Sequence, residues 1–247
     1  MANGVTATLI FTTFSIVARC PRTGMLGVAV CTAVPAVGAL CPFAQPGVGA
    51  IATQSFVNPY LGIDGLRLLE AGLSAEATVA QLLARDPGKE LRQLSIVDRR
   101  GQAAAFTGEG CLPWCGHIVG EGYAVAANMM MDETTVSAMA RAFEEAARAE
   151  LPERLLRALE AGDATGGDYR GRQSAALVVY YTEAYPHRSL RVDEHRTPVA
   201  ELRRIFTLCE RQLFPFVDAL PTRESPGGSD VAGSDIGMLL LKTVDQR

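Results

Sequence analysis

The order of strand-like and helix-like segments is the feature of this 247-residue sequence that most limits its fold. Two runs rich in β-branched and aromatic residues, 6–17 and 25–34, flank a Pro-Arg-Thr-Gly turn, which predicts a hairpin. Later apolar runs predict more strands, and segments with apolar residues at helical spacing predict helices between them. The further strand segments are 47–56, 91–108, 121–130 and 172–181, and the helix segments are 63–73, 74–83, 132–161 and 195–214.

Paired strands that alternate with paired helices, without a βαβ period of parallel strands, predict an α+β domain. We expect a four-layer αββα sandwich, in which two antiparallel sheets stack and helices cover both outer faces. The domain is expected over 13–220, after an N-terminal extension, 1–12, and before a polar, Gly- and Ser-rich tail, 221–247.

Composition argues against several classes of partner and compartment. The formal net charge of −4 and a pI of about 5.5 provide no basic field for nucleic acid. The six cysteines form no CxxC pair, no secretory signal segment is recognised, and no apolar stretch reaches the roughly 20 residues of a membrane helix. We expect a soluble cytoplasmic protein with reduced thiols and no nucleic-acid or membrane partner. An apolar segment in the tail, 236–241, favours a homo-oligomer.

The densest polar cluster is the segment GGDYRGRQ, 166–173, directly before an apolar strand. Its glycines permit unusual backbone angles, and Asp168 can orient or deprotonate a nucleophile. Arg170 or Arg172 can clamp a substrate carboxylate through two hydrogen bonds, and Gln173 is a further candidate for substrate binding. The same residues also fit a tight loop whose Asp–Arg pair only fixes its own shape.

Polar side chains inside apolar strand segments are a second group of candidates. Thr53, Gln54 and Asn128 cost free energy on burial unless they form hydrogen bonds, so they are expected to line a site or to be satisfied core residues. Asn128 suits an oxyanion donor or a partner for a substrate amide. Thr13 can attack a carbonyl if its α-amino group, with a pKa of about 7.7, is free to act as a base. Threonine also simply favours strands.

Motifs for metals and cofactors are weak or missing. Cys111, Cys115 and His117 give three soft ligands without a fourth, which indicates packing more than a metal site, although a thiol paired with His117 is an alternative nucleophile. We retain His117 as a substrate contact and expect no metal. The sequence has no GxxxxGK[ST] loop, dinucleotide fingerprint or GxSxG elbow, so we expect no cofactor.

Four motifs, taken in order, resemble a known bacterial family. They are TFSIVAR (13–19), GVGAIATQ (47–54), GEGCLPWCGHIVGEGYAVAANM (108–129) and GGDYRGRQSAALVV (166–179). Together they are similar to domain of unknown function family 1028, which is placed among the N-terminal-nucleophile hydrolase-like proteins. The resemblance covers 13–215, implies the αββα sandwich, and puts the strand-opening nucleophile of the superfamily on Thr13.

Family members often carry this threonine directly after the initiator methionine, whereas twelve residues precede it here. A free Thr13 therefore requires cleavage of the Thr12–Thr13 bond or a later start site.

Three functional hypotheses follow. The first is a hydrolase of an amide-type, non-peptide C–N bond in a small carboxylated metabolite, with Thr13 attacking, Asn128 or backbone N–H groups holding the oxyanion, and Asp168 with Arg172 orienting the substrate. The second is a deaminase that adds water to an enamine or imine, such as an aminomuconate-type intermediate, for which an acid–base group and a positioned water suffice. The third is a non-catalytic ligand-binding protein on the same scaffold.

Overall fold

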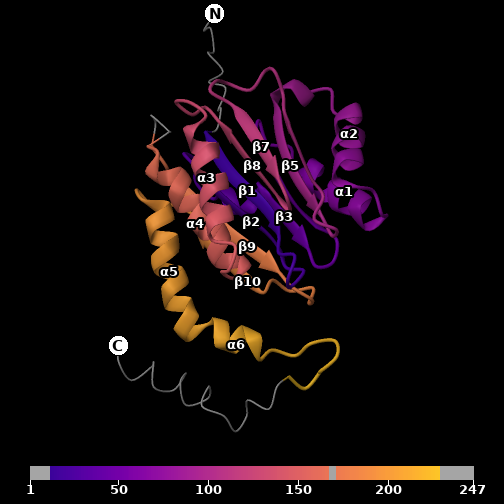
Figure 1. Ribbon diagram of the computed structural model, residues 1–247, viewed down its shortest axis with the longest axis vertical. Coiled ribbons are helices and arrows are strands. Elements are labelled where there is room, and N and C mark those ends of the chain that lie inside the picture. Colours follow the sequence, from indigo (N-terminus) through magenta and orange to yellow (C-terminus); the bar gives the residue numbers. More distant parts are fainter. Residues whose placement is uncertain (1–11, 167–170, 229–247) are drawn as a thin grey trace, which may run out of the picture.

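The computed structural model describes residues 12–166 and 171–228, which form two stacked antiparallel sheets between two layers of helices (Figure 1). The six-stranded sheet has the order β10-β9-β2-β1-β8-β7 and the four-stranded sheet the order β3-β4-β5-β6. The strands of the first are β1 (Thr13–Arg19), β2 (Leu26–Thr32), β7 (Gly116–Gly120), β8 (Tyr123–Asn128), β9 (Ser174–Tyr180) and β10 (Arg188–Val192). Those of the second are β3 (Pro42–Gln45), β4 (Gly49–Ser55), β5 (Arg92–Asp98) and β6 (Ala103–Thr107). The predicted αββα sandwich is confirmed.

The helices cover the outer face of each sheet, and their ends carry the expected signals. The helices are α1 (Pro59–Glu70), α2 (Ala75–Arg85), α3 (Thr134–Glu145), α4 (Leu151–Ala164), α5 (Pro198–Gln212) and α6 (Phe214–Asp218). In Figure 1, α1 and α2 lie on the side of the four-stranded sheet, and α3, α4 and α5 lie on the other side. The Ser74 side chain accepts from the Ala77 N–H at 3.2 Å, and Pro152 and Pro198 lie in the first turns of α4 and α5.

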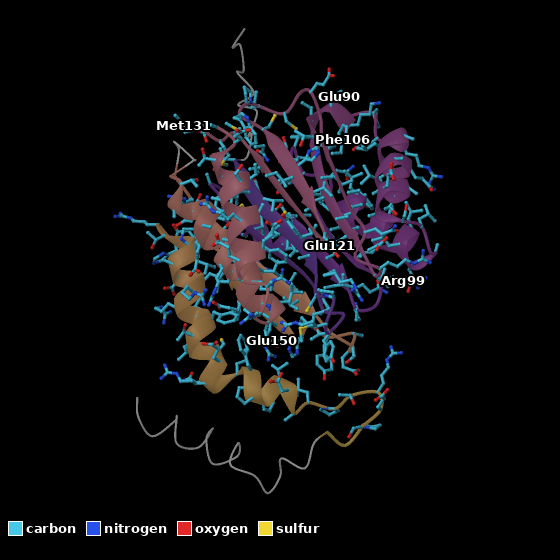
Figure 2. The ribbon with its side chains drawn as sticks, in the orientation of Figure 1. Glu90, Arg99, Phe106, Glu121, Met131 and Glu150 are labelled. Carbon is cyan, nitrogen blue, oxygen red and sulfur yellow. The ribbon has the colours of Figure 1, made fainter. Side chains whose placement is uncertain are left out.

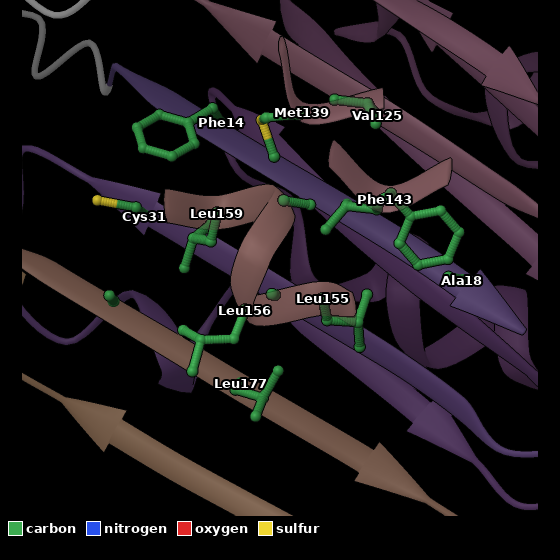
Figure 3. Close-up of a cluster of buried hydrophobic side chains, with 14 of the residues drawn as sticks. Phe14, Ala18, Cys31, Val125, Met139, Phe143, Leu155, Leu156, Leu159 and Leu177 are labelled. Atoms are coloured by element: carbon green, nitrogen blue, oxygen red, sulfur yellow. The ribbon is translucent and has the colours of Figure 1, made fainter. Parts of the chain in front are cut away.

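Alternation along β1 divides the molecule into layers. Phe14 and Ile16 point outward into the largest apolar cluster, where α3 and α4 contribute Phe143 and Leu159 (Figure 3). Val17 points the other way, into an apolar cluster between the sheets. Thr13 and Ser15 share that inner face, so the strand presents hydroxyl groups to the interior of the sandwich.

Three strands were not predicted, and all three lie at sheet edges. These are β3, β7 and β10, and β7 lies between the predicted strand segments 91–108 and 121–130. Edge strands are half-exposed, so their apolar periodicity is weak; β7 also begins and ends with glycine.

In the described residues the first strand spans Thr13–Arg19, so it ends two residues beyond the predicted end at 17. Residues 1–11 of the expected extension, residues 167–170 and residues 229–247 of the expected tail lie outside the described part of the chain. Within that part, no helix has the length and hydropathy needed to cross a bilayer.

Candidate functional site

A group of polar side chains lies between the two sheets, at the end of the sandwich where β1 begins. Cross-strand register places two rows of polar residues there, one row in each sheet. The rows are Thr32, Thr13 and Asn128 in the six-stranded sheet, and Gln54, Gln93 and Thr107 in the four-stranded sheet. With Ser15 and His117 they are called the inter-sheet polar cluster. Most of its members are inaccessible to solvent, and His117, on the edge strand β7, is its exposed end.

Gln93 is the centre of this cluster, and its carboxamide has only one consistent orientation. The Nε2 group donates to the carbonyl oxygens of Ala127 at 2.9 Å and Gly116 at 3.1 Å. Backbone carbonyl oxygens only accept, so this end of the side chain must be the nitrogen. Oε1 therefore accepts from Gln54 Nε2 at 2.6 Å and from Asn128 Nδ2 at 3.0 Å.

The orientation of the Gln93 carboxamide also determines the orientation of the Asn128 carboxamide. Because Nδ2 donates to Gln93, Oδ1 points away from it, and no residue in the described part of the chain donates to this oxygen. Asn128 is fully buried. An unsatisfied buried acceptor costs about 1–3 kcal/mol, so Oδ1 is a natural partner for a donor on a bound molecule. The predicted oxyanion role needs a donor, whereas the unpartnered atom of Asn128 is an acceptor.

The other branch of the cluster leads toward solvent. Gln93 Nε2 also lies 2.9 Å from Thr107 Oγ1, so this hydroxyl can donate its own hydrogen to His117 Nδ1 at 2.8 Å. Partial desolvation of the imidazole lowers the pKa of His117, which favours the neutral ring with its hydrogen on Nε2. The side chains of the cluster are thus amides, hydroxyl groups and a neutral imidazole.

The peptide bond between Thr12 and Thr13 lies against the same row; it is called the processing bond, because a free Thr13 would require its cleavage. The carbonyl oxygen of Thr12 accepts from the Thr32 hydroxyl at 2.5 Å and from the Ala33 N–H at 3.3 Å. The Oγ1 atoms of Thr13 and Thr32 are 3.1 Å apart. Since Thr32 donates to the carbonyl, it accepts from Thr13 in this contact. Two donors on one carbonyl oxygen are the arrangement that stabilises an oxyanion formed there.

Four of the predicted site residues meet in this cluster, and one lies beside it. Thr13, Asn128, Gln54 and His117 are members, although they lie on four different strands, β1, β8, β4 and β7. The backbone N–H of Gln173 donates to the Thr32 carbonyl at 2.7 Å, which puts Gln173 next to the row.

Thr53 does not join the cluster. Its side chain points to the opposite face of β4, where its hydroxyl donates to the Asn58 carbonyl at 3.3 Å. Neighbouring residues of a strand face opposite sides, so Thr53 and Gln54 cannot line one site. Of the two alternatives for Thr53, a site residue or a satisfied core residue, its hydrogen bond to Asn58 fits the second.

The predicted Asp–Arg pair takes a different form. Asp168 and Arg170 lie outside the described residues. Arg172 pairs with Asp163 near the end of α4, with Nε 2.5 Å from Oδ1. Burial raises the pKa of the Asp163 carboxyl, although Arg172 opposes this effect. The Asp163–Arg172 pair is near the same end of the sandwich as the polar cluster. Gly162, which precedes Asp163, packs closely on Phe14 near the start of β1, since a Cβ added to Gly162 would lie 3.1 Å from the Phe14 side chain.

Four members of the cluster are not among the predicted site residues: Ser15, Thr32, Gln93 and Thr107. Gln93 carries the same signal as Gln54, a polar residue in an apolar strand segment, and could have been found by it. Thr32 and Thr107 end their strands and carry no such signal. In the described ranges, no three His, Cys, Asp or Glu side chains are grouped to hold a metal ion, and Cys115 Sγ only approaches the Cys111 carbonyl at 3.5 Å.

Comparison with known proteins identifies the family of the chain and solved structures that it resembles. The sequence model described as "Family of unknown function (DUF1028)" matches residues 13–202. The crystal structure of protein SPO2555 from Silicibacter pomeroyi, titled with the same family, has a TM-score of 0.80 and 29% identity over 88% of this chain and 98% of that chain. Anbu (ancestral beta-subunit) from Yersinia bercovieri has a TM-score of 0.40 and 14% identity over 82% and 96%, which is too weak to support an argument about function. No protein with a curated description matches the sequence.

Proposed function

This chain belongs to the DUF1028 family, and from that premise we propose that it is an N-terminal-nucleophile hydrolase whose Thr13 is exposed by cleavage of the processing bond. The observation that carries the proposal is the pair of donors, Thr32 Oγ1 and Ala33 N–H, on the carbonyl oxygen of Thr12. The match to the family also begins at Thr13, so the twelve preceding residues lie outside the shared region. The proposed reaction is hydrolysis of an amide-type C–N bond in a small metabolite.

Cleavage of the processing bond would use groups already in contact. As Thr13 Oγ1 attacks the carbonyl carbon of Thr12, its proton passes to Thr32 Oγ1, which lies 3.1 Å away, and Thr32 gives its own hydrogen to the carbonyl oxygen. The Ala33 N–H donates to the same oxygen, and the C–N bond then breaks as the carbonyl re-forms and the hydroxyl proton of the intermediate passes to the departing nitrogen. The resulting ester is hydrolysed by water, which leaves residues 1–12 with a carboxylate and Thr13 with a free amino group.

The same threonine would then act on the substrate. Its amino group, with an ordinary pKa of about 7.7, takes the proton of the Thr13 hydroxyl as Oγ1 attacks the substrate carbonyl. The leaving nitrogen takes the proton, and water hydrolyses the acyl-enzyme. We assign Asn128 Oδ1 as the acceptor for an N–H of the substrate amide, because this oxygen is buried and has no partner among the described residues. A carboxylated substrate would suit the Arg172 guanidinium. Arg172 is close to the polar row, because the backbone N–H of the next residue, Gln173, donates to the Thr32 carbonyl.

The test is a screen of small primary amides and N-acyl amino acids with the purified full chain, with released ammonia or amine as the readout. We expect turnover by the wild type, partial activity in Thr13→Ser and none in Thr13→Ala. Thr182→Ala, at an exposed threonine, is the matched control and should behave as wild type. Full activity in Thr13→Ala would refute the assignment of the nucleophile.

A deaminase is the second candidate, favoured by the Asp163 carboxyl. Its raised pKa suits a group that exchanges protons with a substrate, and the reaction would not require cleavage of the processing bond. In that case ammonia would be released from an enamine or imine by the uncleaved chain. Asp163→Asn would abolish the activity, and Thr13→Ala would keep it.

A further inference from the structure

A cavity of about 290 Å³ lies at the end of the sandwich opposite the inter-sheet polar cluster. Its charged lining consists of Arg19, Arg22, Arg100, Arg154 and Glu121. We call it the arginine pocket. In Figure 2, Glu121, which lines the pocket, and Arg99, which precedes Arg100 in the chain, are labelled in the lower part of the sandwich. Glu90 and Phe106 are labelled well above them, at the other end of the four-stranded sheet.

Strand direction explains why the two sites are separate. Thr13 and Arg19 are the two ends of β1, which are about 20 Å apart at roughly 3.3 Å per residue. Asn128 ends β8, whereas Glu121 precedes its first residue. A small molecule in the arginine pocket therefore does not reach Thr13.

The pocket holds an excess of positive charge in a protein whose net charge is −4. Within the described ranges, none of its four arginines forms an ion pair with a carboxylate. Arginines elsewhere in the chain do so; Arg203, for example, contacts both Glu153 and Glu160. Like charges around one cavity repel each other unless an anion compensates them.

Arg154 is held rigidly on the wall of the pocket. Its residue is only 8% exposed, and its guanidinium carbon lies 3.8 Å from the centroid of the Phe143 ring. Nε and Nη2 contact the Phe143 carbonyl oxygen at 3.4 and 3.3 Å, while Nη1 has no hydrogen-bond partner among the described residues. Burial lowers the pKa of Arg154, and Arg22 adds to this effect while Cys20 opposes it. A bound anion would relieve this cost.

Arg22 is also held in place before any ligand binds. Its Nη2 donates to the carbonyl oxygens of Ala149 at 2.8 Å and Arg148 at 3.2 Å, which ties the β1–β2 turn to the α3–α4 turn. Two of the four guanidinium groups are therefore positioned by backbone carbonyls. Positioned donors lose less entropy on binding a ligand.

We propose that the arginine pocket binds a small, multiply charged oxyanion of the phosphate type. Guanidinium groups bind the oxygens of phosphate in pairs of parallel hydrogen bonds, and several of them together suit a charge of −2 or more. The cavity is at the lower limit of about 300 Å³ for small-molecule sites, which fits a diphosphate group better than a whole nucleotide.

Calorimetric titration of pyrophosphate into the full chain at low ionic strength tests this assignment. We expect one saturable site per chain, with affinity weakened at least about tenfold in Arg19→Gln and in Arg100→Gln, since each removes a charged hydrogen-bond donor. Neither side chain forms an ion pair with another described residue, so these variants should fold normally; thermal melting without ligand checks this. Arg211→Gln, at an exposed arginine of α5 without an ion pair among the described residues, is the matched control and should keep the wild-type affinity. Thr13→Ala should also bind normally.

Three results would overturn the proposal. Tighter binding of citrate than of pyrophosphate in the same titration would refute the phosphate type of ligand. An equal loss of affinity in Arg211→Gln would show diffuse charge attraction instead of a site. Absence of saturable binding by the folded wild type would refute the site itself.

Discussion

Replacing Gln93 with leucine should destabilise the protein by removing the centre of the inter-sheet polar cluster. The carboxamide of Gln93 is fully buried and forms hydrogen bonds with five groups. Leucine is similar in size but has no polar atoms. The substitution therefore leaves the amide nitrogens of Gln54 and Asn128 without their acceptor, and the Ala127 and Gly116 carbonyl oxygens without this donor.

The expected cost follows from the groups left unpaired. Each buried donor that loses its partner costs about 1–3 kcal/mol, so the two amide nitrogens alone give about 2–6 kcal/mol. Gln54 keeps a contact of 3.5 Å with the Thr13 carbonyl, which moderates its share. Against a typical folding free energy of about 5–15 kcal/mol, the loss is large enough to measure and small enough to leave a folded population.

Urea unfolding provides the assay, with the midpoint and the slope fitted for each variant. The matched control is Ser95→Ala, two residues along β5 on the same face as Gln93. The Ser95 hydroxyl is buried and has no partner among the described residues, so its removal should be neutral or stabilising. The reasoning is refuted if Gln93→Leu stays within about 1 kcal/mol of wild type, or if Ser95→Ala loses as much stability.

Three further changes test other parts of the molecule. The hydrogen bond from Arg92 lowers the pKa of Asp86, so this pair stabilises the fold above the unfolded pKa and ceases to do so as pH falls through the folded pKa. Asp86→Asn should cost about 2 kcal/mol at neutral pH and make stability less sensitive to acid in urea unfolding at several pH values; an unchanged acid slope would contradict this. Thr32→Val should slow cleavage of the processing bond about 100-fold or more in a mass-spectrometric time course, whereas Thr32→Ser should not; equal rates would exclude the hydroxyl. Gly62→Ala should lower stability by about 1–3 kcal/mol, because the new Cβ would lie 2.2 Å from the Phe43 ring; an unchanged melting temperature would show that the ring moves freely.

The sequence predicts the central elements of this fold well because their patterns are strong. Strands β1, β2, β4, β5, β8 and β9 are apolar runs that are buried on both faces or nearly so. Capping and proline signals likewise locate the starts of α2, α4 and α5. The edge strands β3, β7 and β10 are stabilised by pairing with a neighbour, and such pairing leaves little trace in local composition.

The candidate site was predictable only in part for a related reason. Polar residues in apolar strands identify Gln54 and Asn128, but only the cross-strand register shows that Gln93 joins them. Register also decides which of two neighbours faces the interior, and this separates Gln54 from Thr53. The contact of Thr32 with the Thr12 carbonyl depends on the pairing of β1 with β2 and has no signature in the sequence.

Intact mass combined with N-terminal sequencing of the purified protein tests the central claim most directly. We expect a wild-type chain that begins at Thr13, and a Thr13→Ala variant that keeps residues 1–12. A wild-type chain that hydrolyses amides while the processing bond stays intact would contradict it.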